Sequence, residues 1–451
     1  MPVVLLVGED GRVTSAQIEA SVSPEFDRAA IVAAQRWTFE PAMRDGKAVA
    51  SKIRSVVRFA ASPEAHPHHH AVVTSSGKST RVAGESASAP SVVRVTGTTP
   101  PRSASEVVRG RDVMLAAPHR TASDALAAVP GVFVTQHSGE GKAHQIFLRG
   151  FDAVHGQDLE LWVGGVPVNE VSNVHGQGYA DLHFVMPEVI RQVQATPGTF
   201  DPKQGDFAVA GSIRMKLGYP ESGVTAKGSI GSFGGRRLFL AYHPKGSSDE
   251  TFAAADVYST DGFGRSRAAR RASAIAQMTH DLSDGFALRV LASTYASRYD
   301  SAGVVPAADI ESGRLNRFAT LDPKQGGHST RHQLLLELHR DEDKGRWSVA
   351  PFVVLRSLGL RQNFTGYFVD TQRGGKDRLD SDNTQQKNDS ITVGMTASYR
   401  KNIKLLSSRD AVEVGVYGRH DIVDQSQRRL SELNDAPTAT LVDASVRGTN
   451  I

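Results

Sequence analysis

Imidazole, amide and carboxylate side chains gather in one glycine-rich part of this chain. The string HGQ occurs twice, at 155–157 and 175–177, and Tyr179 and Asp181 closely follow the second copy. Such groups fix the orientation of a metal chelate or a polar ligand in a binding site. The candidate ligand-binding residues are His155, Gln157, Asp158, His175, Gln177, Tyr179 and Asp181.

The same side chains have an alternative use. Most polar side chains in loops hydrogen-bond to backbone or to water, so this group could satisfy local turns without touching a ligand. No GxSxG, HExxH, phosphate-binding loop or dinucleotide fingerprint occurs in a supporting context. We therefore expect binding and no enzymatic activity.

Short apolar strands broken by glycine-rich turns must position these residues. A helix is expected to begin at the capping signal of Thr121 and to end before Pro130-Gly131. Together the elements predict a small mixed α/β unit over 100–218. The predicted strands are Val132–Thr135, Ile146–Arg149, Leu159–Val163, Val189–Thr196 and Ser212–Leu217.

From residue 219 onward, apolar and polar residues alternate with the period of a strand. Each segment is close to the ~10 residues that a tilted membrane strand requires. Within 329–339, one face carries His332, Leu334, Leu336 and Leu338. The other face carries Arg331, Gln333, Glu337 and His339, and Leu335 breaks its polar pattern. The nine candidate strands are 224–231, 235–243, 250–259, 271–282, 286–297, 329–339, 346–356, 390–400 and 410–420.

The connections between these strands are sorted by length. Short turns at 244–249, 283–285 and 340–345 alternate with long polar connections at 260–270, 298–328 and 357–389. A transmembrane barrel shows this sorting, whereas a soluble β-sandwich has little reason to do so. The pattern favours a barrel.

The first 99 residues predict a separate domain and a linker. Residues 1–60 combine strand patterns with a helix that Ser23 caps, which predicts a small α+β domain. Residues 61–99 are rich in Ser, Ala, Gly and Pro, and this composition indicates a flexible linker. The linker histidines could bind a metal, but nothing preorganises them, so a solvated tract is expected; they are His66, His68, His69 and His70.

Composition excludes several classes of protein. The chain of 451 residues has no cysteine, which rules out disulfides and cysteine metal sites. A net charge of +4 without a dense basic stripe argues against a nucleic-acid partner. The chain contains no run of ~18 apolar residues, so no transmembrane helix is expected. No signal-peptide pattern is present at Met1, so we expect an export signal further upstream or its removal.

The motifs resemble those of TonB-dependent outer-membrane receptors. QIFLRGF at 145–151, ELWVGGVPVN at 160–169 and FAVAGSIRM at 207–215 resemble the receptor plug domain. WTFEPA at 37–42 resembles the C-terminal domain of the energy transducer TonB, and SVVRVTGT at 91–98 resembles a TonB box. The alternatives are an unrelated small α+β domain and an ordinary linker strand.

The resemblance implies a mainly β fold in four parts. These are a TonB C-terminal-like α+β domain (1–60), a flexible linker with a TonB-box-like strand (61–99), a mixed α/β plug (100–218) and an incomplete antiparallel transmembrane β-barrel (219–451). Receptors of this type have about 22 strands, so nine cannot close around a plug. Because Gly448–Ile451 also reads as a polar loop, we expect a truncated barrel.

The resemblance also assigns roles to residues. An extended TonB box would pair with a strand edge of TonB through main-chain hydrogen bonds; its residues are Val92, Val93, Arg94, Val95, Thr96 and Gly97. A buried Arg149 would pair with barrel carboxylates. Gly164 stands where the family usually has aspartate. The expected plug-structural residues are Arg149, Gly150, Gly165, Pro167, Asn169, Gly205 and Gly211.

The implied function is active uptake of a metal chelate or another scarce nutrient across the outer membrane, with the N-terminal region in the periplasm. The expected partners are the TonB complex, outer-membrane lipid and the small-molecule substrate. No cofactor and no resident metal are expected. The alternatives are a signalling or assembly receptor that binds without transport, and a non-functional gene fragment.

Overall fold

The computed structural model describes most of the chain beyond residue 104. The described ranges there are 105–116, 121–136, 142–342, 345–365, 382–403, 405–406, 410–431 and 434–451. Before it, residues 2–8, 10, 13–18, 27, 31, 34, 42–44, 47–49 and 51–56 are described. The chain forms two compact units, 1–100 and 101–451, and each is described by itself.

The first unit combines strands with helical backbone. β1 (Pro2–Val7) lies between β2 (Val13–Ile18) and β5 (Ser51–Val56) in an antiparallel sheet, and β3 (Ala42–Arg44) pairs with β4 (Lys47–Val49). Asp27, Ile31 and Ala34 are helical at a spacing that places them on one face, and Ala34 is fully buried. The candidate TonB-box residues 92–97 and the linker histidines lie outside the described residues.

The plug region, residues 105–217 of the second unit, is built on a five-stranded mixed sheet. Its strand order is β11-β10-β13-β12-β6, and only β10 and β13 run parallel. The strands are β6 (Val107–Gly110), β10 (Leu159–Val163), β11 (Val166–Pro167), β12 (Ile190–Pro197) and β13 (Gly211–Leu217). A second sheet contains β7 (Val132–Thr135), β8 (Gln145–Leu148) and β9 (Phe151–Asp152).

Helices in the plug region are short. The expected capping signal is confirmed: Thr121 accepts from the backbone of Asp124, whose side chain accepts in return from the Thr121 backbone. This box starts α3 (Ala122–Ala125), and a 3₁₀ turn, η1 (Leu126–Ala128), ends the helix before Pro130. The remaining helical elements are α2 (Arg111–Ala116) and η2 (Pro187–Val189).

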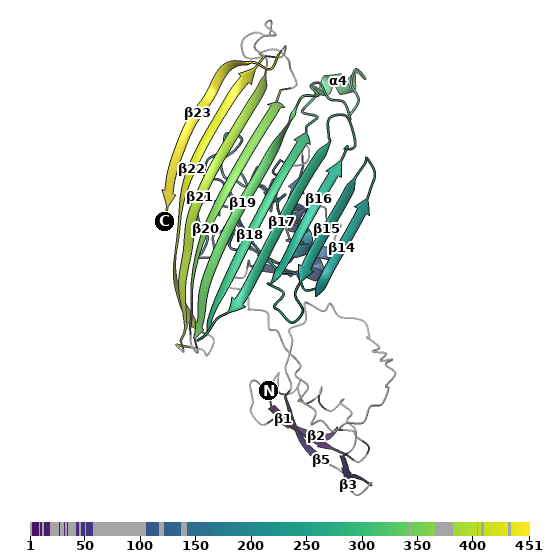
Figure 1. Cartoon of the computed structure of the whole chain (residues 1–451), viewed down its shortest axis with the longest axis vertical. Coiled ribbons are helices and arrows are strands. Elements are labelled where there is room, and N and C mark those ends of the chain that lie inside the picture. Colours follow the sequence, from purple (N-terminus) through teal and green to yellow (C-terminus); the bar gives the residue numbers. More distant parts are fainter. Residues whose placement is uncertain are drawn as a thin grey trace. The chain divides into compact units, whose positions relative to one another are not determined.

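The rest of the second unit is one antiparallel sheet in which each strand pairs with the next (Figure 1). Its strands are β14 (Gly223–Ile230), β15 (Arg236–His243), β16 (Phe252–Thr260), β17 (Ala269–Asp281), β18 (Phe286–Asp300), β19 (Gly326–Glu342), β20 (Gly345–Asn363), β21 (Asn383–Asn402), β22 (Ala411–Leu430) and β23 (Pro437–Asn450). All nine expected strands are present. Within the described residues, β14 and β23 are the edges of a sheet that does not close.

The end of the chain corrects one expectation. Gly448–Asn450 was expected in a polar loop, but it belongs to the tenth strand, β23. Exposed and half-buried residues alternate along this strand, and neither face carries a strong apolar pattern. Its one partner among the described strands is β22. Local composition therefore conceals a strand that the pairing with β22 defines.

The expected sorting by length holds for the later strands, whereas the connections 244–251 and 261–268 are equally long. The short ones join β17 to β18 and β19 to β20, whereas residues 301–325 join β18 to β19 and residues 364–382 join β20 to β21. Because consecutive strands are antiparallel, both long connections lie at the same end of the sheet. Figure 1 shows α4 (Ala307–Glu311) at this end, called here the long-connection end.

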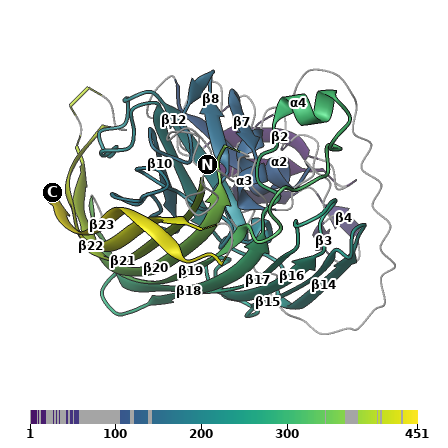
Figure 2. The ribbon, with the colours of Figure 1, turned by 90° about the horizontal axis from the view of Figure 1, so that it is seen from above.

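The plug region lies on the concave side of the ten-stranded sheet (Figure 2). Many residues that point to this side are polar and buried, among them Arg331, Arg356 and Arg419, which are each at most 6% exposed, and apolar ones such as Leu291 and Phe352 pack against the plug. Residues on the other side are apolar and exposed, for example Leu334, Ile391 and Val414. The sheet is thus inside-out compared with that of a soluble protein.

β21 shows the dimensions of the apolar band. Its outward residues run from Asp389 through Ile391, Val393, Met395, Ala397 and Tyr399 to Lys401. The 13 residues from Asp389 to Lys401 span about 40 Å of extended chain, or about 30 Å across a bilayer at the usual strand tilt. The charged ends therefore bracket a band of hydrocarbon thickness. No helix in the described part of the chain is long and apolar enough to cross a membrane.

A charge at the middle of this band should destabilise the protein in lipid. Val393→Lys places an ammonium at mid-depth, so the free energy of unfolding in lipid vesicles should fall by about 2–4 kcal/mol. Asp389→Lys on the same face, at the edge of the band, should change it by at most about 1 kcal/mol. Urea titrations followed by tryptophan fluorescence measure both, and equal effects would argue against a lipid-facing band.

Candidate functional site

The two HGQ segments lie side by side. The Ala180 amide donates to the His155 carbonyl at 2.8 Å, which joins the first segment to the residues after the second. Gly156 and Gly178 have φ of +112° and +69°, and a Cβ on either would come within 2.7 Å of an atom in the other segment. Glycine is required here for the close approach of two backbones.

Asn169 holds both segments against β10. Its side chain is 3% exposed, and its oxygen accepts from the Leu161 amide at 2.7 Å. Its amide nitrogen lies within hydrogen-bond distance of three carbonyls, those of Gly156 (2.8 Å), Leu159 (2.9 Å) and Gly178 (3.1 Å). One buried amide therefore satisfies backbone groups that the turns would otherwise leave unpaired.

Three of the predicted ligand-binding residues form one cluster, called here the apical group: His155, His175 and Tyr179. The Nε2 atoms of the two histidines are 3.3 Å apart, and the Tyr179 ring centroid lies 5.8 Å from that of His155 and 5.9 Å from that of His175. His155 is buried and His175 half-buried. The group contains one histidine from each HGQ string.

The apical group faces the long-connection end of the sheet. His175 Nδ1 lies 3.0 Å from Oε1 of Gln386, near the start of β21, and its ring stacks on that of Phe364 at 5.9 Å. Phe364 begins the long connection from β20 to β21. The Lys142 ammonium lies over the ring of the same phenylalanine, 5.9 Å from its centroid. Burial lowers the pKa of Lys142 to about 8.

The other predicted ligand-binding residues lie elsewhere. Gln157 and Gln177 are exposed, and Asp158 is half-buried. Asp181 is fully buried next to His183, whose Nδ1 is 2.7 Å from its carboxylate. Burial alone would raise the pKa of the Asp181 carboxyl, but His183 and Arg356 hold it well below its usual range.

A buried arginine joins two plug carboxylates to the sheet. Arg356 of β20 forms an ion pair with Glu170 and lies 3.8 Å from the Asp181 carboxylate. Glu170 also accepts from Asn173 and from Asn388 of β21, each at 2.8 Å. Burial raises the pKa of the Glu170 carboxyl, although Arg356 opposes this effect.

Four further arginines of the sheet reach the plug region. Arg289 (β18), Arg331 (β19) and Arg419 (β22) donate to the carbonyls of Gly164 (3.0 Å), Pro167 (2.8 Å) and Asn169 (3.1 Å) respectively. Arg237 of β15 forms a two-pronged pair with Glu188, at 2.6 and 2.9 Å. We call these four residues and Arg356 the arginine seam.

The arginine seam corrects the expectation for Arg149. This residue is exposed and occupies the turn between β8 and β9 with φ of +51°, so it is not a buried partner of barrel carboxylates. At the seam the polarity is reversed, with cations on the sheet and acceptors on the plug. The sequence motif located the turn at Arg149 and Gly150 but did not indicate which side of the interface carries the charge.

The glycine turn after β10 docks against the sheet. Gly164 and Gly165 have φ of +59° and +91°, and a Cβ on Gly164 would lie 2.6 Å from Leu291. A Cβ on Gly165 would lie 3.4 Å from Leu335. Leu335, which interrupts the polar face of β19, therefore points inward to pack against this turn.

The last plug residues before the sheet fold around Gly211 and Gly205. Gly211 has φ of +144°, and a Cβ there would approach the Thr196 carbonyl to 2.5 Å. The Gly205 amide donates to Glu160 at 3.1 Å, and Gly150, with φ of +83°, completes the β8–β9 turn. These glycines serve backbone geometry.

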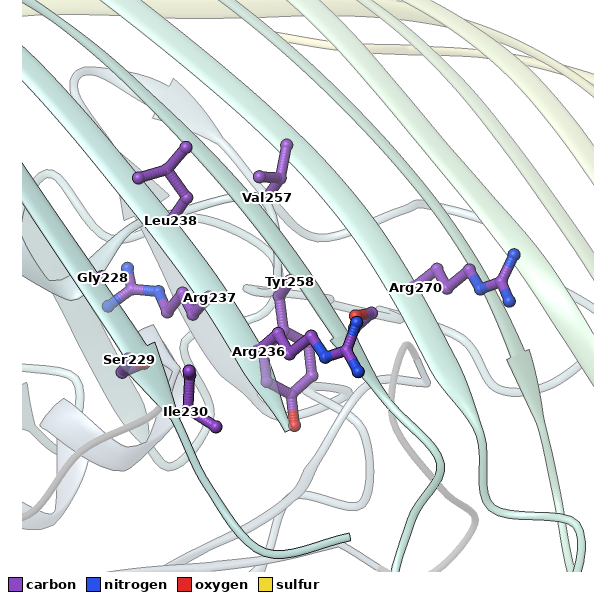
Figure 3. Close-up of a pocket in the computed structure, with 10 residues that line it drawn as sticks. Gly228, Ser229, Ile230, Arg236, Arg237, Leu238, Val257, Tyr258 and Arg270 are labelled. Carbon is purple, nitrogen blue, oxygen red and sulfur yellow. The ribbon is translucent and has the colours of Figure 1, made fainter. Parts of the chain in front are cut away.

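A cavity of about 790 Å³ lies over the first strands of the sheet (Figure 3). Its lining includes Arg237, which turns to the plug, and also Leu238 and Val257, which are about half exposed on the outer face. It therefore forms around the edge strand β14, and no predicted site residue lines it. In the part of the chain that is described, no three His, Cys, Asp or Glu side chains are placed to hold a metal.

Removing the Asn169 side chain should loosen the plug. Asn169→Ala leaves one amide and several carbonyls unpaired in a buried place, so the free energy of unfolding should fall by about 2–4 kcal/mol. Gln177→Ala, an exposed amide in the adjacent segment, should change it by less than about 0.5 kcal/mol. Denaturant titrations in lipid compare the two; equal values would mean that Asn169 does not hold the segments.

Removing Arg356 should leave two carboxylates without their cation. We expect Arg356→Met to lower the free energy of unfolding by about 3–5 kcal/mol at pH 7. Because the pKa of Glu170 then rises further, the folded state binds a proton more readily than the unfolded chain, and acidification to about pH 5 should restore part of the loss. Arg346→Met, an exposed arginine of the same strand, should cost at most about 1 kcal/mol; a similar cost for both variants, or no recovery in acid, would contradict this role.

Comparison with known proteins agrees with this geometry. Residues 2–61 match the family described as Gram-negative bacterial TonB protein C-terminal, and residues 101–212 match the TonB-dependent Receptor Plug Domain family. The vitamin B12 transporter BtuB of Vibrio vulnificus is 28% identical over 146 residues, which are 32% of this chain and 23% of BtuB.

Solved receptors share the fold. The unliganded ferric citrate transporter FecA superposes with a TM-score of 0.57 at 15% identity, covering 76% of this chain and 51% of FecA. The ferric yersiniabactin uptake receptor FyuA of Yersinia pestis gives 0.52 at 13% identity, covering 77% and 60%. The chain thus spans about half the length of these receptors. The recognition from sequence is confirmed: this is a chain of the TonB-dependent receptor type, with a plug, part of a barrel sheet and a TonB C-terminal-like domain.

Proposed function

We propose that this protein is a TonB-dependent outer-membrane transporter that takes up a scarce nutrient, such as a metal chelate. The observation that carries the proposal is the inside-out sheet, with an exposed apolar outer face and a polar inner face that covers the plug region. Such a sheet suits lipid on one side and a filled lumen on the other.

The plug acts as the gate. The arginine seam, whose donors reach plug carbonyls and carboxylates, holds it to the sheet together with apolar contacts such as those of Leu291 and Leu335. Polar contacts of this kind can be exchanged for water when the plug moves, whereas a continuous apolar interface would resist wetting. This supports a plug that stays closed at rest and yields to a pull.

Substrate enters from the long-connection end and meets the apical group. That end carries the connections 301–325 and 364–382, which correspond to the long extracellular loops of barrels. BtuB and FecA are named for vitamin B12 and ferric citrate, both metal complexes, and this supports a metal chelate as substrate class.

The energy comes from TonB in the periplasm. The segment 92–97 pairs with a strand edge of TonB by β-augmentation, and the pull on this segment reaches the plug through β6. Among the described strands, β6 is an edge of the plug sheet and pairs only with β12. An edge strand detaches from a sheet with the loss of one ladder of hydrogen bonds.

Proline substitution tests the TonB partner. Val93→Pro removes a backbone donor from the segment that should pair, so binding of the TonB periplasmic domain to the full chain in detergent should weaken at least about tenfold. Ser86→Pro in the adjacent linker is the matched control and should bind normally. Equal binding by both variants would remove the TonB-box assignment.

Uptake distinguishes transport from binding alone. Cells that carry the protein should accumulate radiolabelled vitamin B12 or ferric citrate only with an intact proton gradient, and Val93→Pro should abolish accumulation but retain surface binding. Binding that never leads to accumulation would favour a signalling or assembly receptor.

A further inference from the structure

The orientation of the His175 ring follows from its neighbours. Its Nδ1 lies 3.0 Å from Oε1 of Gln386, and the amide nitrogen of that glutamine donates to the Val174 carbonyl at 3.2 Å. This second bond fixes which end of the amide faces the imidazole, so Nδ1 carries the hydrogen. The lone pair of His175 therefore lies on Nε2, which faces Nε2 of His155.

The two Nε2 atoms already have the spacing of metal ligands. Two imidazole nitrogens at ~2.0–2.1 Å from a tetrahedral ion lie about 3.3 Å from each other. The observed separation is 3.3 Å. The ring centroids are 5.0 Å apart and the planes are inclined by 39°, so the rings meet at an angle and not end to end.

The surroundings hold both rings in place. The backbone of His155 is fixed by the Ala180 amide, and the His175 amide donates to the Asn173 side chain at 2.8 Å. The Tyr179 ring flanks both imidazoles. A pair preorganised in this way loses little entropy when it takes up a ligand.

We propose that His155 and His175 coordinate, through their Nε2 atoms, a tetrahedral transition-metal ion such as zinc that is part of the imported substrate. The inference rests on the proposed function and names the substrate class. The proposal names these two imidazoles as the protein ligands. Two protein ligands suit a cargo that must leave, whereas resident structural zinc takes four.

Metal titration of the full chain tests the site. All samples carry Asn in place of His66, His68, His69 and His70, so that the linker cannot contribute. The chain in detergent should bind one Zn²⁺, and Co²⁺ in its place should give the strong visible absorption of a tetrahedral complex. His155→Asn and His175→Asn should each weaken Zn²⁺ binding at least about tenfold.

Two further variants complete the experiment. His144→Asn is the matched control, because His144 and His183 stack face to face at 4.8 Å and do not converge on a point; it should bind Zn²⁺ normally. Gln386→Ala leaves both ligands but removes the bond that orients His175, and it should weaken binding about tenfold. If a histidine variant fails to fold, Gln386→Ala still tests whether the pair binds Zn²⁺.

The inference is overturned if the chain binds no Zn²⁺, or if binding survives both histidine substitutions and Gln386→Ala. Such a result leaves the proposed function intact, because pairing with TonB and dependence on the proton gradient do not involve this pair. Conversely, Zn²⁺ bound at the pair of a protein that never binds TonB would refute the function and retain the site.

Discussion

The alternation of side chains across each strand is the constraint on which the rest of this structure depends. Because successive residues point to opposite faces, one register decides at once which residues meet hydrocarbon and which meet the plug. In β21 the odd-numbered residues from Ile391 to Tyr399 share the outer face, whereas Gln386, Asn388 and Thr392 share the inner one. A shift of a single residue would bury the apolar set and expose the polar set to lipid.

The polar inner face explains how the plug is held. Arginines on five strands of the sheet donate to carbonyls and carboxylates on the surface of the plug. Their long side chains span the distance between the sheet backbone and the plug backbone. The strands thereby also place Gln386 and Phe364 against His175. The arginine seam and the apical group are thus built on the same wall, with the apical group nearer the long connections.

Much of the fold could be predicted from local pattern. Thr121 and Asp124 predict a capped helix, and the glycine pair at 164–165 predicts a tight turn, because each feature depends on neighbouring residues alone. β23 was missed because only its pairing with β22 defines it. Arg149 was misplaced because burial is a property of the assembled unit and not of a motif.

The candidate site was only half predictable. The repeated HGQ string pointed to His155 and His175, but nothing local indicated that Gln157 and Gln177 would be exposed or that Asp181 would join a buried ion pair. Arg356, Gln386 and Phe364 lie about 200 residues away in the sequence. Extending the alternation of β21 back beyond residue 390 would have placed Gln386 on the inner face, and that is the one signal that was available.

Spin-label scanning of β21 in lipid vesicles tests the central claim most directly. The chain contains no cysteine, so single cysteines at 390–397 can be labelled without other changes. Labels at 391, 393, 395 and 397 should collide with lipid-soluble oxygen, and labels at 390, 392, 394 and 396 should be shielded by the plug, with a period of two. Uniform access for a water-soluble relaxation agent along the whole strand would contradict a wall between lipid and plug.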